Sequence, residues 1–114
     1  MSTITETDTI NGQRDGRAIA WTPLAGSDVG RVVDVGLDRP DRSVQFDGTF
    51  DSGTAILLGS LDGSQYETAI DIYGNAISLT AHGIRQIGVL YRYFKPSVSG
   101  GGGSCAITCT MNLR

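Results

Sequence analysis

Three turn-bounded segments between Val44 and Leu79 decide the fold class. They read VQFDGTF (residues 44–50), TAILLGSLDGSQY (54–66) and GNAISL (74–79). Aromatic, β-branched and other apolar residues alternate with polar ones, and Gly, Asp, Asn or Ser clusters interrupt them about every 8–12 residues. Short strands at this spacing are typical of antiparallel sandwiches and barrels. The stretch therefore predicts an all-β domain.

The rest of the chain continues this pattern. We expect an antiparallel, jelly-roll-like β-sandwich of about eight strands that occupies residues 17–114 as a single domain. Residues 80–86 have weak helical or turn character, and Pro96 favours an edge position for the strand in which it lies. The expected strands cover residues 17–24, 28–37, 42–50, 54–60, 66–72, 76–80, 89–98 and 104–113.

Bulk properties exclude several classes of protein. The chain has 114 residues and a formal net charge of -3, without a basic stripe, so direct nucleic-acid binding is not expected. No apolar run approaches the roughly 20 residues that span a bilayer, so we expect no membrane association. The polar N-terminus lacks the basic and apolar regions of a signal peptide, which predicts assembly in a cytoplasm.

The cysteines are expected to be buried free thiols. Cys105 and Cys109 fall on one face of the last expected strand. At about 3.3 Å per residue their Cα atoms lie roughly 13 Å apart. A disulfide needs Cα atoms within about 7 Å, so the two cannot pair inside one straight strand.

Residues for catalysis or metal binding are sparse. His82 is the single histidine and next to Gly83 suits a turn, and the chain has no Gly-x-Ser-x-Gly or His-Glu-x-x-His motif. Asp47, Asp51 and Asp62 fall at turns, where Asp is favoured for local hydrogen bonds, and a calcium site built from them is a nonspecific alternative. We therefore expect a protein that is not an enzyme and holds no metal or cofactor.

Residues 1–16 are predicted to form an extended N-terminal arm. The segment is rich in Thr, Asp and Gly, which favours extended structure over a helix. Either the arm becomes ordered on a neighbouring molecule, or it is a frayed terminus. In the first case its contact residues are Thr3, Ile4, Thr5, Thr7 and Ile10.

The expected strand at residues 54–60 is apolar on both faces. Ala55 and Leu57 lie on one face and Ile56 and Leu58 on the other, with Leu61 at the following turn. Only one face of a sandwich strand meets the core, so the second face is covered by a loop or the arm, or forms a subunit interface. We expect an interface at Ile56, Leu58 and Leu61. The expected core anchors are Trp21, Phe46, Phe50 and Tyr66.

Four segments resemble a family of small virion proteins of tailed bacteriophages and prophages. They are FDGTF (46–50), LGSLDGSQY (58–66), GNAISLTA (74–81) and RYFKPSV (92–98). A Trp is common in that family where Tyr66 stands here. The resemblance implies a structural protein that decorates, or cements, the outer capsid surface of the virion by binding the major capsid protein. We expect it to do so as a homotrimer.

Two alternatives stay open. The Gly-Ser-x-Asp-Gly-x-x-aromatic turn also looks like one in galactose-binding-like jelly-roll modules, which implies carbohydrate binding through Tyr66 or Tyr91. Against this, aromatic residues make up only 7% of the chain and most occupy alternating strand positions. The other alternative is a neck or tail component of the same virion.

Overall fold

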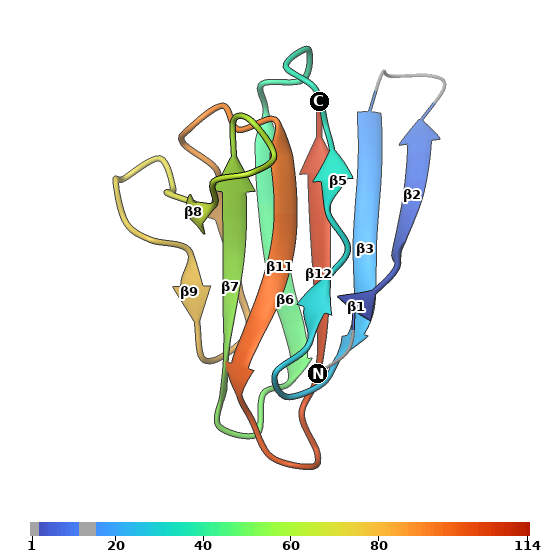
Figure 1. Cartoon of the computed structure of the whole chain (residues 1–114), viewed down its shortest axis with the longest axis vertical. Helices are drawn as coiled ribbons and strands as arrows, with labels where there is room; N and C mark the ends of the chain where they lie inside the picture. The colour runs from blue at the N-terminus through green and yellow to red at the C-terminus, as the bar shows by residue number, and fades with distance from the viewer. Residues whose placement is uncertain (1–2, 12–15) are drawn as a thin grey trace.

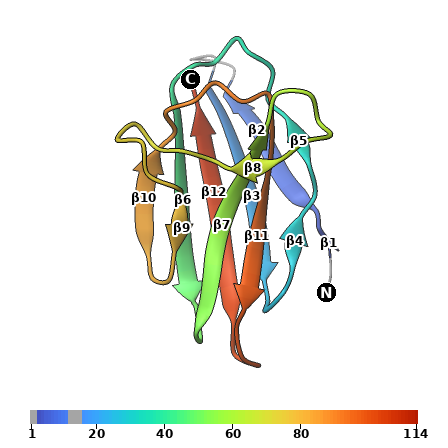
Figure 2. The ribbon, with the colours of Figure 1, turned by 60° about the vertical axis from the view of Figure 1, so that its left-hand side comes forward.

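The protein is a two-layered β-sandwich, as the sequence predicts. The computed structural model describes residues 3–11 and 16–114, and in that part it has twelve strands in two sheets and no helix (Figure 1). Figure 2 shows β7 and β11 of one sheet in front of β6, β12 and β3 of the other. Neighbouring strands run antiparallel except β1 and β4, which are parallel.

One sheet has five strands in the order β10-β6-β12-β3-β2. Its centre is β12, in which Cys109 lies between Phe46 of β6 and Trp21 of β3. The long pairing of these three strands makes the most continuous part of the fold, although the register of β12 against β3 shifts between Ile107 and Cys109. The strands are β2 (Glu6–Asn11), β3 (Gly16–Leu24), β6 (Arg42–Thr49), β10 (Gly83–Gln86) and β12 (Ala106–Leu113).

The other sheet has seven strands, five of them only two residues long. Its main path is β1-β4-β11-β7-β8, with β5 added beside β11 and β9 beside β7. The long pair β11 and β7 forms its centre. The strands are β1 (Thr3–Ile4), β4 (Val29–Gly30), β5 (Val33–Asp34), β7 (Gly53–Ser60), β8 (Glu67–Thr68), β9 (Ser78–Leu79) and β11 (Tyr93–Gly100).

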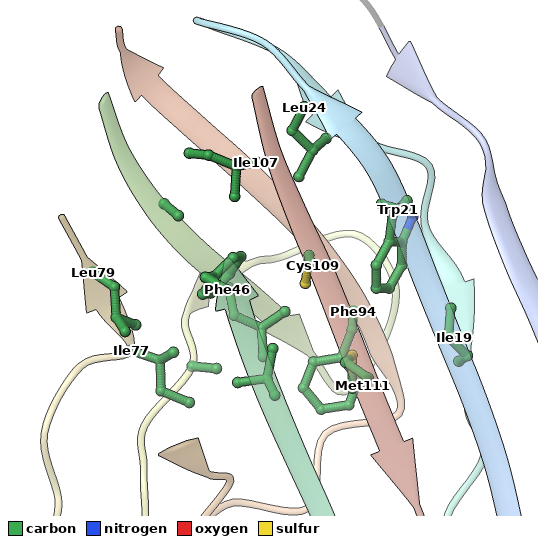
Figure 3. Close-up of a cluster of buried hydrophobic side chains, with 14 of the residues drawn as sticks. Ile19, Trp21, Leu24, Phe46, Ile77, Leu79, Phe94, Ile107, Cys109 and Met111 are labelled. Atoms are coloured by element: carbon green, nitrogen blue, oxygen red, sulfur yellow. The ribbon is translucent and has the colours of Figure 1, made fainter. Parts of the chain in front are cut away.

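The core fills the space between the sheets with alternate residues of the long strands. Trp21, Phe46 and Phe94 are fully buried there, and Phe50 is 9% exposed at one end. Figure 3 shows Cys109 and Met111 among these aromatic side chains. Trp21 also donates its Nε1–H to the carbonyl oxygen of Arg31 at 3.0 Å, which satisfies its only polar group. Both cysteines are buried and unpaired.

The structure corrects several expected element boundaries. The strand expected at residues 89–98 begins only at Tyr93, because the Tyr91 N–H bonds the Val89 carbonyl in a tight turn. The strand expected at 66–72 is reduced to β8. Residues 83–86, expected in a turn or weak helix, form the edge strand β10.

Pro96 lies in the interior strand β11, not at a sheet edge. On one side β11 pairs with β5 at Tyr93 and Phe94 and with β4 at Ser97. Pro96 therefore falls opposite the gap between β5 and β4, where its missing N–H breaks no ladder.

The described part of the N-terminal segment pairs within its own domain. Ile4 lies in β1 beside β4 and packs against the core, and β2 pairs with β3 and forms an edge of the five-stranded sheet. Glu6 accepts two hydrogen bonds from the Arg31 guanidinium, at 3.0 and 3.1 Å. Residues 1–2 and 12–15 of the expected arm lie outside the described residues. So does the side chain of Ile10, whose backbone pairs with Arg17.

Candidate functional site

The outer face of the seven-stranded sheet carries the aliphatic residues expected at an interface. Ile56 and Leu58 point away from the core and are half-buried. Leu58 lies between Lys95 of β11 and Thr68 of β8. Ile56 has serines on both sides, Ser97 of β11 and Ser78 of β9. The N-terminal segment does not cover this pair, because β1 lies at the far edge of the sheet.

Leu61 begins a rigid loop that follows β7. Its side chain is 67% exposed. Leu61 does not continue the outer face formed by Ile56 and Leu58, because β7 ends at Ser60. Asp62 Oδ1 accepts hydrogen bonds from the Ser64 and Gln65 amides at 2.8 and 2.9 Å and from the Ser60 hydroxyl at 3.0 Å. Hydrogen bonds from Gln65, Ser64 and Ser60 stabilise the carboxylate and lower the pKa of Asp62.

Tyr66 ends this loop, and it lies outside the core in which it was expected. The residue is half-buried, and the Lys95 ammonium stands 4.3 Å from the centre of its ring. Tyr66 does not reach the core, because the loop carries the chain beyond the end of β7. Its hydroxyl is buried without a hydrogen-bond partner in the described structure. Desolvation is the main reason why the pKa of Tyr66 is raised.

Beside this loop lies a recess of about 410 Å³, which we call the Tyr91 recess. Its walls include Leu61, Gln65, Tyr66, Glu67 and Tyr91. Tyr91 is only 2% exposed, and its hydroxyl donates to Glu67 Oε2 at 2.7 Å. Burial, and then the bond to Glu67, raise the pKa of Tyr91 to about 12.

The ring of Tyr91 is fixed against backbone. A Cβ added at Gly59 would lie 2.6 Å from the Tyr91 Cγ, so only glycine allows the ring this close to β7. Tyr91 also makes an edge-to-face contact with Phe94, with ring centres 5.7 Å apart. It therefore offers no open ring face for stacking, and Lys95 occupies one face of Tyr66.

A second recess lies at the turn that precedes β9. We call it the Tyr73 recess; it measures about 430 Å³ and combines the turn at residues 71–75 with β10. Tyr73 is 81% exposed, in contrast to Tyr91. Tyr73 is not among the site residues predicted from the sequence. An aromatic residue immediately before the turn dipeptide Gly74-Asn75 was the signal that could have identified it.

Arg42 connects the segments that build the two recesses. Its side chain is 1% exposed, and its guanidinium donates hydrogen bonds to the carbonyls of Arg39 (2.7 Å), Gly36 (2.8 Å) and Tyr91. The Arg42 carbonyl in turn accepts the Ile87 N–H at 2.9 Å. Burial lowers the pKa of Arg42, and three carbonyl dipoles compensate the buried charge.

The aspartates considered as calcium ligands do not form a metal site. Among the side chains that the structure describes, those of residues 3–7 and 16–114, there is no group of three His, Cys, Asp or Glu suited to a metal ion. Asp51 instead accepts the Ser104 N–H at 3.0 Å, and His82 lies 3.2 Å from Asp47 on the surface. No helix in the described ranges could cross a membrane.

Comparisons with known proteins identify shared folds. No protein-family model and no curated protein matches the chain. Among solved structures, the SPBc2 prophage-derived protein YomS superposes with a TM-score of 0.57 at 13% identity, over 86% of this chain and 93% of YomS. A carbohydrate-binding module of AlyQ, in complex with 4,5-unsaturated mannuronic acid, gives a TM-score of 0.50 at 12% identity, over 83% of this chain and 76% of the module. The chain thus shares its sandwich fold with a prophage protein and with a carbohydrate-binding module.

Proposed function

We propose that the protein is a non-enzymatic structural protein of a phage particle that decorates the outer capsid surface. The observation that carries the proposal is the outer sheet face at Ile56 and Leu58. There, two aliphatic side chains stay half exposed: Ile56 between two serines, and Leu58 between Thr68 and Lys95. Covering Ile56 and its serine neighbours with another protein surface removes apolar area from water without desolvating a charged group in the strand positions on either side. The fold similarity to YomS, which spans 86% of this chain and 93% of YomS, supports a phage-related role.

The occupant of this face is a second copy of the chain, within a homotrimer. The exposed Thr3 and Thr7 lie on β1 and β2 at the sheet edges, Thr5 lies between these two strands, and the three residues contact the major capsid protein. A protein that binds only the assembled shell stabilises that shell by mass action. A trimer strengthens this effect, because its second and third contacts form at high effective concentration.

A charge on the proposed interface provides the first test. The variant Ile56→Asp should convert the trimer into a monomer, measured by light scattering. Its binding to heads of the same phage that lack the protein should weaken by about tenfold or more in a sedimentation assay, or about 1.4 kcal/mol. Thr110→Asp is the matched control, because Thr110 is half-buried on the outer face of β12, a central strand of the other sheet. It should leave both measurements unchanged.

Three results would contradict the proposal. One is a wild-type protein that is monomeric and does not sediment with heads. Another is equal loss of binding in the Ile56→Asp and Thr110→Asp variants. The third is immunogold labelling of the virion neck or tail in place of the head, which would favour the neck or tail alternative.

A further inference from the structure

The Tyr73 recess has the composition of a ligand site that decoration of a capsid does not require. Three large apolar side chains at this corner stay exposed: Ile72 by 48%, Tyr73 by 81% and Ile84 by 57%. Tyr73 is the most exposed large hydrophobic residue that the structure describes. Clustered exposed apolar side chains around a hollow mark binding surfaces more often than single ones do.

The turn that carries Tyr73 is held in place by the Asp71 carboxylate and by backbone hydrogen bonds. Asp71 is 6% exposed, and its Oδ1 accepts the N–H groups of Tyr73 at 2.9 Å and Asn75 at 3.0 Å. The Ile72 N–H donates to the Gln86 carbonyl at 3.1 Å, which fixes the turn against β10. A ligand would therefore meet an ordered wall, and little conformational entropy would be lost on binding.

A close backbone contact completes this support. A Cβ added at Gly88 would lie 2.4 Å from the Asp71 carbonyl oxygen. Only glycine lets the chain after β10 approach the turn this closely.

Polar side chains at the recess suggest the chemistry of its ligand. The Arg85 guanidinium donates one hydrogen bond, from Nη1 to the Ile84 carbonyl at 2.9 Å, and pairs with no carboxylate in the described part of the chain. Its other donors are available for a bidentate contact with a carboxylate. The exposed amides of Asn75 and Gln86 supply donors and acceptors that match hydroxyl groups.

We propose that the Tyr73 recess binds a hexuronic acid residue of an acidic polysaccharide. The C–H face of the sugar ring packs against Tyr73, the C6 carboxylate pairs with Arg85, and the hydroxyls bond the two amides. The volume of about 430 Å³ lies within the roughly 300–1,000 Å³ usual for small-ligand sites. Asp71 does not oppose the ligand strongly, because its carboxylate is buried and engaged by two N–H groups.

The proposal is tested by titrating the ¹⁵N-labelled protein with short oligomers of glucuronic, galacturonic, mannuronic and guluronic acid. Each is paired with the corresponding neutral sugar. At least one acidic oligomer should shift amide signals of residues 72–76 and 84–86 and bind at least about tenfold more tightly than its neutral counterpart. Added salt should weaken this binding, because the Arg85 contact is exposed.

Three variants assign the binding to this recess. Tyr73→Ala and Arg85→Gln should each reduce the affinity by about tenfold or more. Tyr66→Ala, which changes the other recess, should bind as the wild type does. The proposal is overturned if no acidic oligomer shifts these signals, if the shifts fall elsewhere, or if the neutral sugars bind equally. Equal binding of N-acetyl-aspartate or N-acetyl-glutamate would show that a simple carboxylate suffices and would overturn the saccharide assignment.

Discussion

The Tyr91 recess and the Tyr73 recess have similar volumes but use their tyrosines in opposite ways. Tyr91 is 2% exposed and its hydroxyl is bound to Glu67, whereas Tyr73 is 81% exposed at the end of a turn. Burial makes the first tyrosine a part of the folded scaffold. Exposure leaves the second tyrosine, Tyr73, available to a ligand. The position of an aromatic residue relative to the sheets decides which recess has an open ring face.

The largest expected effect on stability is that of replacing Arg42, which connects the segments that build the two recesses. Replacing Arg42 by Met should leave the carbonyls of Gly36, Arg39 and Tyr91 without their buried donor. We expect a loss of about 2–4 kcal/mol in the free energy of unfolding, measured by urea denaturation. Amide signals of both recesses should shift together.

An exposed arginine serves as the control for this variant. Arg92 forms a surface ion pair with Asp34 at 3.1 Å, so Arg92→Met should cost much less stability. Equal losses in the two variants would mean that the three carbonyl contacts of Arg42 contribute little.

A smaller effect, with a characteristic pH dependence, is expected at Tyr91. Its pKa in the folded protein is about 12, above the ordinary value of 10. The folded state therefore holds the phenol proton more tightly, and this contribution is fully present below pH 10 and lost as the pH rises from 10 to 12. Tyr91→Phe should cost about 0.5–1.5 kcal/mol near neutral pH, through the lost bond to Glu67.

The measurement compares urea midpoints of the wild type and Tyr91→Phe across the alkaline range. The difference between them should shrink as the pH approaches 12. Tyr73→Phe is the control, because the Tyr73 side chain is 81% exposed. A difference that stays constant with pH would contradict the role given to the Tyr91 proton.

The smallest effect on stability is expected at Tyr73. Because its side chain is 81% exposed, Tyr73→Ala should change the free energy of unfolding by less than about 0.5 kcal/mol. Thermal and urea denaturation measure this directly. A loss as large as that of a core aromatic residue would show that Tyr73 supports the fold, and the contrast between the two recesses would disappear.

The core could be predicted well because its signal is local. Strict alternation through residues 42–50 placed Val44 and Phe46 on one face, and both are buried between the sheets. Strand boundaries were less predictable where partners are distant in sequence. The segment at 83–86 becomes a strand only because β6 offers it a free edge, and the N-terminal segment pairs with β3 for the same reason.

The candidate sites were predicted less completely. Ile56 and Leu58 could be found, because an apolar residue on the second face of a strand stands out against the period of two. Tyr66 was expected in the core and lies outside it, since a loop can lead an aromatic residue past the end of a strand without any change in the local pattern.

The sequence by itself determined the class of fold, the inward face of the strand at residues 42–50 and the reduced state expected of Cys105 and Cys109. These properties follow from alternation and spacing along a single strand. Only the tertiary structure decided that Tyr91 is buried while Tyr73 is exposed, and that Arg42 joins the two recesses. Those outcomes depend on contacts between segments far apart in the chain, such as the approach of Tyr91 to Gly59, which no local pattern encodes.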